Sequence, residues 1–492
     1  MTPAAGIVGL LTVAALGPYT PVTGVRTEQI AVYATFGFGL LRLNWIRGRA
    51  PARLIVPAVL MAALAFIAIV GSVDRAPNLT GFVSGGLIAG LDNVLLPVAT
   101  IGAVWFVTTR CSNLNQSLLV VCRIVVWAAV VNTVAATMSI TMDLTPVLAR
   151  FWENGSAQAV AERAAQLGRF TGIFNQPAEA GLFYGIALIV AVFLYRANTV
   201  RLAFVTPVIL AGGVLTVSKV FLLVGLPIGL FQLLRTRGRR ALRLVGVGAT
   251  VLIGSLAAVV WSETRWTGGT YLARLFVPPA GGSSAVDLYT AGRLGDDSTL
   301  RALVESVLDA APSFGVGVQG LAVAYDNGWV EALVVGGLVG AVVYSLVLSY
   351  LLVVWRLGPD GSATDLLGGL ALLLLGASMG LPALTANRVA TIVWILIALL
   401  LARPQVRSGA AHQRMTRPAN GSSARGPSAR AGLRIQAWAR ASTPSRDTLK
   451  FPRRTASPTA SRGSASTLPS QDRIADTGPK LARANQTRLR IE

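Results

Sequence analysis

Arginine and lysine residues occur in polar segments that interrupt an otherwise apolar sequence. Arg169 lies in the polar segment 141–178, Arg293 lies in the longer segment 262–327, and Lys219 lies in a short polar turn between two apolar runs. Guanidinium groups bind phosphate oxygens through paired donors. If the fold brings these cations together at one membrane surface, they would suit a polyanionic headgroup.

Carboxylates that could act as a general base occur close to these cations in the sequence. Asp326, directly before an apolar run, is the first candidate to accept a proton from a hydroxyl group. Glu179 is the second, because it opens the apolar run that follows Asn175. Asp326 could instead cap a helix, with Asn327 as a companion cap. Glu331, one turn further along, is expected to face a polar interior.

Each cation also has a purely structural explanation. Arg169 could extend along the membrane interface with its charge in water. Lys219 could be a solvated turn residue, and Arg293 could pair with Asp296 or Asp297 in a surface salt bridge.

Two more charged residues, Asp92 and Arg123, fall inside apolar runs. Charged side chains in such positions usually pair with one another or face a cavity. A structural ion pair between these two is the simple expectation.

The composition is that of a membrane protein. The 492 residues are 53% hydrophobic and only 13% charged, with a mean hydropathy of +0.62, whereas soluble chains are about a quarter charged. Apolar windows of about 20 residues recur, each long enough to cross a bilayer. The sequence predicts an all-α, polytopic transmembrane bundle of about twelve spans. The expected spans are 4–19, 28–44, 52–72, 83–107, 117–140, 179–195, 202–217, 219–234, 241–261, 328–355, 364–383 and 388–402.

Orientation follows from arginine-rich loops after the second, sixth and eighth spans, which the positive-inside rule assigns to the cytoplasm. Both termini are then cytoplasmic. The segments 141–178 and 262–327 face outside, and the larger of them joins spans nine and ten.

Local patterns predict two short helices in the outer segments. An alanine-rich helix is expected near 156–167, with Gly168 as the residue that ends it. An amphipathic helix is expected near 300–308, with Arg301 and Glu305 paired four residues apart. A glycine-rich turn, 314–320, follows that helix.

The net charge of +22 comes mostly from the C-terminal tail, 403–492, which holds 18 Lys and Arg against 4 Asp and Glu. This tail has too few apolar residues to fold alone and is predicted to be a disordered cytoplasmic segment. It would be attracted to anionic lipid of the inner leaflet, so the charge does not indicate a nucleic-acid partner. With Cys111, Cys122 and His412 as the sole cysteines and histidine, no disulfide framework or histidine metal site is expected.

The order of these motifs resembles a known family. An Arg-x-x-Gly-x-Phe-Asn-x-Pro run (169–177) precedes one span, and Thr-x-Ser-Lys (216–219) forms an outer turn. A long outer loop with Gly-Arg, an amphipathic helix and Phe-Gly-x-Gly (314–317) ends in Asp-Asn-x-x-x-Glu (326–331). This arrangement is similar to the O-antigen ligase and Wzy-type O-antigen polymerase superfamily. The resemblance covers most of 1–402 and none of the tail.

The resemblance implies a metal-independent glycosyltransferase, without a cofactor, in the bacterial cytoplasmic membrane. Its donor would be an undecaprenyl diphosphate-linked saccharide, and its acceptor a second lipid-linked glycan or another surface molecule. Arg169, Lys219 and Arg293 would hold the diphosphate, with Asn175, Asn327 and Glu331 as further substrate-binding residues. Lys219 stands where the family more often has arginine.

Within this superfamily, ligases carry a histidine near the start of span ten, where this chain has Tyr325, Asp326 and Asn327. The difference favours a polymerase over a ligase. A twelve-span transporter or flippase is the alternative from another class, although the sequence shows no clear internal repeat of the kind that transporters often have. A scaffold protein without catalytic activity is the third alternative.

Overall fold

The computed structural model describes residues 2–20, 25–42, 51–73, 87–109, 113–152, 156–262, 299–322, 325, 327–359, 361–385 and 387–403. The chain divides into two units, residues 1–409 and 410–492, and all described residues belong to the first. Arg293, Asp326 and the tail beyond Arg403 lie outside the described residues.

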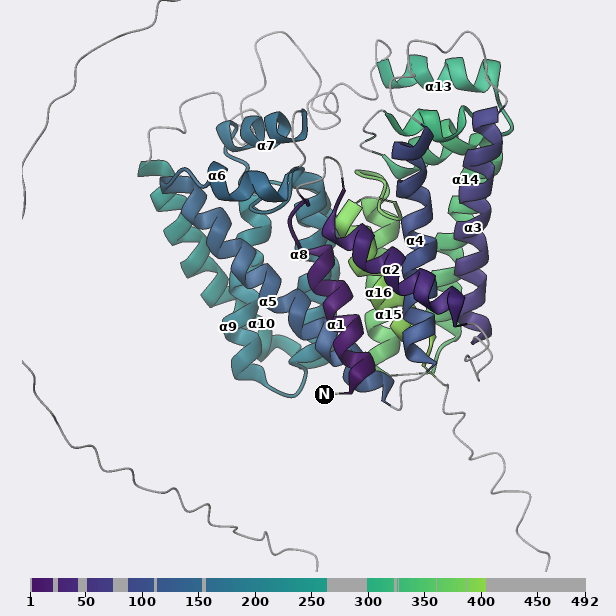
Figure 1. The fold of residues 1–492 in the computed structure, drawn as a ribbon. Helices are drawn as coiled ribbons and strands as arrows, with labels where there is room; N and C mark the ends of the chain where they lie inside the picture. Colours follow the sequence, from purple (N-terminus) through teal and green to yellow (C-terminus); the bar gives the residue numbers. More distant parts are fainter. Residues whose placement is uncertain are drawn as a thin grey trace, which may run out of the picture. The chain divides into compact units, whose positions relative to one another are not determined.

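Every regular element in the described ranges is helical, and the one β-bridge there joins Tyr19 and Arg26. Long helices pack side by side, with the shorter α6, α7 and α13 at one end (Figure 1). We call this end, which carries the two expected outer segments, the outer end, and the opposite one the inner end. The elements are α1 (Pro3–Ala15), α2 (Thr27–Leu41), α3 (Ala52–Val73), α4 (Leu87–Thr108), α5 (Leu114–Thr141), α6 (Thr145–Leu148), η3 (Ala149–Phe151), α7 (Ser156–Gln166), α8 (Pro177–Leu194), α9 (Thr199–Leu215), η4 (Phe221–Gly225), α10 (Leu226–Ser262), α13 (Thr299–Ala310), η6 (Gly317–Ala322), α14 (Gly328–Leu357), α15 (Ser362–Ala377) and α16 (Asn387–Leu401).

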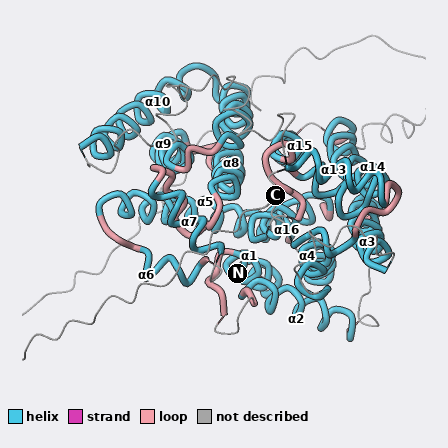
Figure 2. Tube along the Cα trace, turned by 90° about the horizontal axis from the view of Figure 1, so that it is seen from above, coloured by secondary structure: helices cyan, strands magenta, loops and turns pink. Residues whose placement is uncertain are grey.

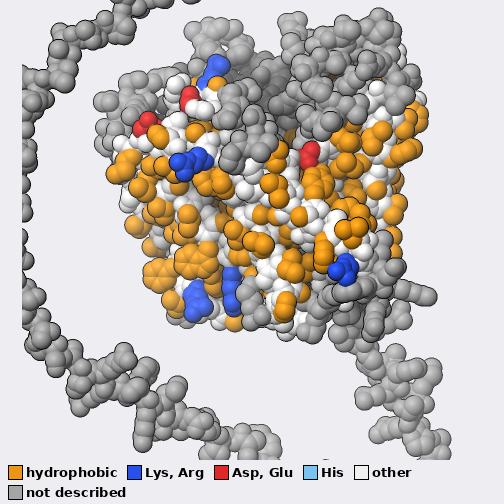
Figure 3. Space-filling model, in the orientation of Figure 1, with side chains coloured by type: hydrophobic (Ala, Val, Ile, Leu, Met, Phe, Trp, Pro, Cys, Tyr) orange, Lys and Arg blue, Asp and Glu red, His pale blue; other side chains and the backbone are white. Residues whose placement is uncertain are grey.

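The helices have the length and composition of membrane spans. In the described part of the chain, α3, α4, α5, α8 and α14 are long and apolar enough to cross a bilayer, and shorter apolar helices accompany them. Apolar side chains cover the middle of the face drawn in Figure 3, with charged ones toward its upper and lower ends. Phe204, for example, is 74% exposed. Lipid tolerates such a surface, whereas water does not. The all-helical class is confirmed, and the count of twelve spans stays a prediction.

Two of the expected spans, 219–234 and 241–261, are not separated by a loop. η4 is a π-helical turn that leads into α10, whose helical backbone continues through the expected connection, so the chain turns between the two apolar stretches without a separate loop. Arginine-rich sequence favours helix at least as well as a loop, because arginine has high helix propensity.

The η4–α10 stretch nevertheless turns back on itself. Phe221 packs against Gly213 near the outer end of α9, and Leu256 packs beside Leu215 of the same helix. In a straight helix Phe221 and Leu256 would lie about 50 Å apart. The stretch therefore leaves the outer end and returns to it, as two expected spans would.

α14 is broken at Gly337, whose φ is +60° and ψ −157°. Its two parts fold against each other, because the ring centroids of Trp329 and Tyr344 lie 5.2 Å apart and a Cβ on Gly340 would lie 2.6 Å from the Ala332 carbonyl oxygen. In one straight helix Trp329 and Tyr344 would be separated by about 22 Å. The expected span 328–355 is therefore helical but broken at Gly337, and it is not one continuous helix.

The glycine-rich turn after α13 fills this break. Val316 N–H donates to the Val334 carbonyl across 2.8 Å, and Leu338 N–H donates to the Pro312 carbonyl across 2.9 Å. Backbone groups freed by the break thus find new partners, as a buried helix end requires. Gly315 has a φ of +64°, and a Cβ there would lie 2.4 Å from the Val334 oxygen.

The core centres on α16 and α8. α16 lies between α4 and α15 when the bundle is seen from above (Figure 2), and its side chains from Arg388 onward are buried all round. A helix that is apolar on every face belongs inside a large bundle. α16 therefore positions whatever its first turn carries at the centre of the outer half.

The two short outer helices are confirmed. α7 ends before Gly168, which has a φ of +76°, as expected of a residue that terminates a helix. In α13, Arg301 Nε donates to Glu305 Oε1 across 2.9 Å, so the expected pair forms.

Candidate functional site

The run 168–177 folds as a tight loop held by one asparagine of α5. Asn132 Nδ2 donates to the Thr171 carbonyl across 3.1 Å, and its Oδ1 accepts from Ile173 N–H across 2.8 Å. Gly172 between them has a φ of +64°, and a Cβ there would lie 2.1 Å from Asn132 Oδ1. Only glycine fits this position.

Arg169 reaches from this loop to the turn that follows α9. Its Nε and Nη2 donate to the carbonyls of Thr216 and Val217, each across 3.4 Å. Lys219 lies two residues further along, and both cations are half-buried. The fold therefore brings Arg169 to the turn that carries Lys219. These are two of the three cations that the sequence predicts to lie together.

The same turn is strained. Val217 has a φ of +46° and is the only non-glycine residue in the described ranges with a positive φ. A β-branched residue rarely adopts this conformation. Ser218 follows it, is 1% exposed, and lies against Gly181 of α8. Strain of this kind persists where the surrounding contacts over-determine the backbone.

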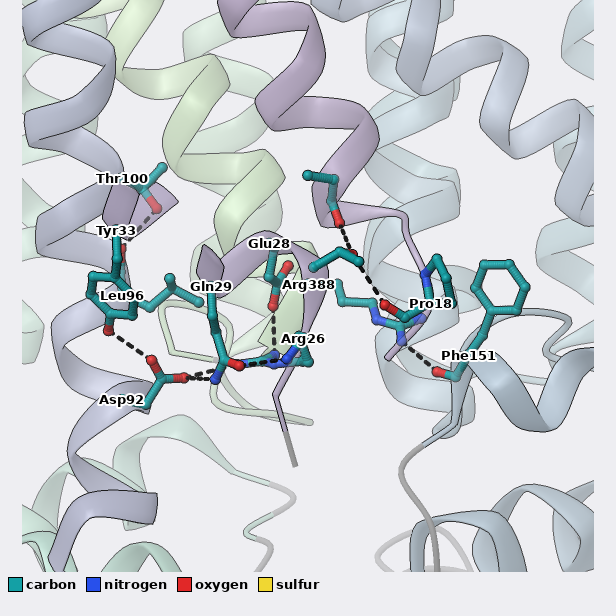
Figure 4. A network of polar contacts seen from close by, with 12 residues as sticks. Pro18, Arg26, Glu28, Gln29, Tyr33, Asp92, Leu96, Thr100, Phe151 and Arg388 are labelled. Carbon is teal, nitrogen blue, oxygen red and sulfur yellow. Dashed lines mark hydrogen bonds and ion pairs between the residues drawn. The ribbon is translucent and has the colours of Figure 1, made fainter. Parts of the chain in front are cut away.

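A network of charged and polar side chains connects the start of α2 with α4 (Figure 4). Arg26 Nη1 lies 2.7 Å from Glu28 Oε1, and Arg26 Nη2 lies 3.1 Å from Asp92 Oδ2. Tyr33 and Gln29 also donate to the Asp92 carboxylate. Asp92 thus pairs with Arg26, so the expected pair with Arg123, an exposed residue, is wrong.

Burial alone would disfavour the charge of Arg26, which is 5% exposed. The nearby carboxylates, Glu28 foremost, outweigh burial and raise the pKa of the guanidinium above its ordinary value. Arg26 is therefore a fixed cation.

Arg388, in the first turn of α16, joins this network to the loop. Its Nη1 donates to the Ile173 carbonyl across 3.1 Å, and its Nη2 donates to the Phe151 carbonyl. Its guanidinium also stacks over the ring of Tyr19, 5.2 Å from the centroid. Arg388 is 4% exposed, so it is a core residue that ties α16 to the outer segment.

Glu179 occupies the first turn of α8 and is also 4% exposed. It interacts electrostatically with Arg388, Glu28 and Arg26. Its Oε1 has no hydrogen-bond partner among the described residues. A buried carboxylate with an open acceptor is costly, which marks this position for a role beyond packing.

Asn327 and Glu331 form a second group on the first part of α14. Asn327 Oδ1 caps the helix by accepting from the backbone N–H of Trp329 and Val330. Thr385 Oγ1 donates to Glu331 Oε1 across 2.5 Å. Glu331 also lines a small cavity together with apolar side chains of α3 and α4. The carboxylate faces the interior of the bundle.

The connection between α15 and α16 links the two groups. Thr385 binds Glu331, whereas Arg388, three residues later, binds the loop that contains Arg169 and lies near Glu179. One short segment thus positions carboxylates from two helices that are distant in sequence.

The sequence candidates divide as follows. Arg169, Asn175, Glu179 and Lys219 lie around the outer ends of α8, α9 and η4, with Asn175 half-buried in the loop, and Asn327 and Glu331 lie on α14. Arg293 and Asp326 lie outside the described residues.

Sequence reasoning missed Arg26, Glu28 and Arg388. Each is a charged residue at, or one turn inside, the start of an apolar run. This position is the feature of the sequence that could have identified them, because charges there usually face a polar interior. Arg388 in particular is the first residue of the expected span 388–402.

The arrangement combines cations at the outer surface with buried carboxylates behind them. It could hold an anionic group and move a proton at a nearby hydroxyl. Within the described ranges, no group of three or more His, Cys, Asp or Glu is arranged to hold a metal ion. No protein-family model matches the chain, and no curated protein matches it either.

Proposed function

We propose that the chain is a membrane-embedded polymerase of lipid-diphosphate-linked saccharide units for a cell-surface polysaccharide. It acts on the extracytoplasmic face of a bacterial cytoplasmic membrane, and both termini lie in the cytoplasm. The observation that carries the proposal is that Arg169 bonds to the turn of Lys219 while Glu179 lies buried at the start of the adjacent helix. The resemblance of the motif order to the O-antigen ligase and polymerase superfamily points the same way.

In this mechanism the cations hold the diphosphate of the donor. Arg169, Lys219 and Arg293 bind its oxygens and stabilise the charge that develops as it leaves. A hydroxyl of the acceptor glycan attacks the anomeric carbon, and the bond between that carbon and the diphosphate oxygen breaks. The hydroxyl proton passes to a carboxylate, with Asp326 and Glu179 as the candidates, and undecaprenyl diphosphate departs.

A ligase of the same superfamily would use the same donor with a different acceptor. The histidine that marks ligases has no counterpart in residues 1–402, since His412 is the single histidine of the chain. This absence favours the polymerase.

Transport of a lipid-linked glycan is the second candidate, and the break in α14 favours it. Discontinuous helices line the substrate sites of many transporters, where freed backbone groups face the substrate. Here, however, the freed groups of Val334 and Leu338 bind the turn after α13. Their bonding to protein rather than to a cavity weighs against this alternative.

The test measures chain growth in the native host after deletion of the gene and complementation with variants. Arg169→Ala should leave single lipid-linked units unextended. Arg163→Ala, which removes an exposed arginine of α7 six residues away, should restore growth. Membrane levels of both variants serve as the control for folding. Full chain growth with Arg169→Ala at normal protein level would contradict the diphosphate clamp, and glycan movement into vesicles without glycosyl transfer would support transport.

A further inference from the structure

A second pocket lies at the inner end of the bundle, away from the candidate site. The end of α8, the first third of α10, the end of α14 and the start of α15 form its walls. The lining side chains that carry the argument are Val192, Arg196, Phe231, Arg235, Trp355 and Asp365.

Two glycines of α15 shape the wall of this pocket. A Cβ on Gly368 would lie 2.3 Å from the Trp355 indole, and a Cβ on Gly369 would lie 2.0 Å from Gln232 Nε2. Because neither glycine has a side chain, Trp355 and Gln232 lie directly on α15. Gln232 Nε2 also donates to the Asp365 carbonyl across 2.9 Å, which fixes the wall.

The lining changes from apolar to cationic along two chain segments. On α10, Phe231 precedes Arg235 by four residues, so the two lie on one helix face. At the end of α8, Val192 precedes Arg196 by the same interval. In both cases the arginine is the member nearer the inner end. This order matches an amphiphile whose acyl chain lies within the bundle and whose charged group lies at the surface.

The pocket borders the surface that faces the acyl chains of a bilayer. Phe231 lines it and is 61% exposed. Trp355 is half-buried at the same level, and tryptophan is enriched at the membrane–water boundary. A lipid can therefore enter from the side, without crossing water.

The charge balance at the pocket favours an anion. Arg235 Nη1 lies 3.5 Å from Asp365 Oδ1, so this carboxylate offsets one guanidinium. Arg196 is exposed and adds a further positive charge. Basic pockets between spanning helices on the cytoplasmic side suit the headgroups of anionic lipids.

We infer that this pocket binds an anionic phospholipid of the inner leaflet. Arg196 and Arg235 bind its phosphate, and Val192, Phe231 and Trp355 contact its acyl chain. The site is separate from the basic tail and does not depend on the proposed polymerase activity.

The test uses the full chain in nanodiscs of phosphatidylcholine that contain a minor share of phosphatidylglycerol. The chain is then extracted in mild detergent, and the lipid it retains is measured by mass spectrometry. The wild-type chain should retain phosphatidylglycerol in preference to phosphatidylcholine. Arg196→Ala with Arg235→Ala should lower this retention about fivefold for each arginine removed.

The matched control removes two exposed arginines of the same end that do not line the pocket, through Arg201→Ala with Arg243→Ala. It should retain phosphatidylglycerol like the wild type. Asp365→Asn should increase retention, because it frees Arg235 while keeping the shape of the side chain. This opposite effect cannot come from a folding defect.

Equal losses in the two double variants would overturn the proposal, since retention would then reflect only the general charge of the inner end. Displacement of phosphatidylglycerol by millimolar inorganic phosphate would also overturn it, because the pocket would then be a site for soluble anions. Retention of phosphatidylcholine and phosphatidylglycerol in their bulk ratio would do the same.

Discussion

The guanidinium of Arg388 donates a hydrogen bond to the carbonyl of Ile173 across 3.1 Å, although 215 residues separate them in the chain. This bond joins the most buried helix of the bundle to the loop that carries Arg169. The outer segment 141–178 is therefore attached to the core and does not lie loosely on its surface.

Replacement of Arg388 should destabilise the chain strongly. Arg388→Ala leaves Glu179 without its main buried counter-charge and leaves the Phe151 and Ile173 carbonyls without a donor, which should lower the free energy of unfolding by about 3–5 kcal/mol. Thermal unfolding in detergent, followed by tryptophan fluorescence, measures the loss. Arg123→Ala, at an exposed position of α5, is the control and should change stability little. Equal melting of the two variants would refute the role of Arg388.

Gly172→Ala should destabilise the loop by about 1–3 kcal/mol. The new Cβ would meet Asn132 Oδ1 and would force a positive φ on alanine. Gly254→Ala is the matched control, because Gly254 lies in α10 with nothing within 4 Å of its Cβ position. That change should be neutral or should raise helix stability slightly. A loss in the control as large as in Gly172→Ala would show that the loop geometry is not the cause.

Ser72→Ala should test how the turn after α13 is attached to α3. Ser72 Oγ donates to the Ala68 carbonyl and also accepts from Val318 N–H across 2.7 Å. Its removal leaves a buried N–H unpaired, at a cost of about 1–3 kcal/mol. Ser139→Ala removes a hydroxyl that bonds within its helix, to Ala135, and should cost much less. The measurement is the unfolding midpoint of each variant. Equal shifts for Ser72→Ala and Ser139→Ala would contradict a stabilising contact between Ser72 and the turn after α13.

Glu331 and Thr385 should be energetically coupled. A cycle of Glu331→Gln, Thr385→Val and the double variant should give a coupling of about 1–3 kcal/mol in the free energy of unfolding, because the buried Thr385 hydroxyl donates to the half-buried Glu331 carboxylate. Additive effects would mean that the contact contributes nothing. The same variants also test whether the contact matters for activity. If Glu331 and Thr385 only stabilise the fold, variants that remain folded should show unchanged chain growth.

Much of the fold could be predicted from local pattern. The helix 156–166, its end at Gly168, and the Arg301–Glu305 pair all depend on residues a few positions apart. Periodicity and capping rules act over that range. The apolar runs likewise gave the helices of the bundle.

The break in α14 could not be predicted in this way. Gly337 lies in an apolar run that reads as one span, and its conformation depends on contacts with Pro312 and Val316. Such contacts follow from tertiary packing, not from the run itself.

The candidate site could be predicted only in part, because the sequence shows local patterns but not the contacts between distant segments. Arg169 and Lys219 stand in polar turns, where the sequence marks them. Arg388 and Glu28 stand at the starts of apolar helices, and their partners come from distant segments. Only the assembled bundle reveals that pairing.

The fold-back of α14 changes what the bilayer encloses. The second part of the helix, residues 338–357, is about 30 Å long, and this length alone matches the thickness of the hydrocarbon layer of a bilayer. The cap residue Asn327 therefore begins its helix beside the middle of the second part, since a Cβ on the next residue, Gly328, would lie 2.4 Å from the Tyr344 hydroxyl oxygen.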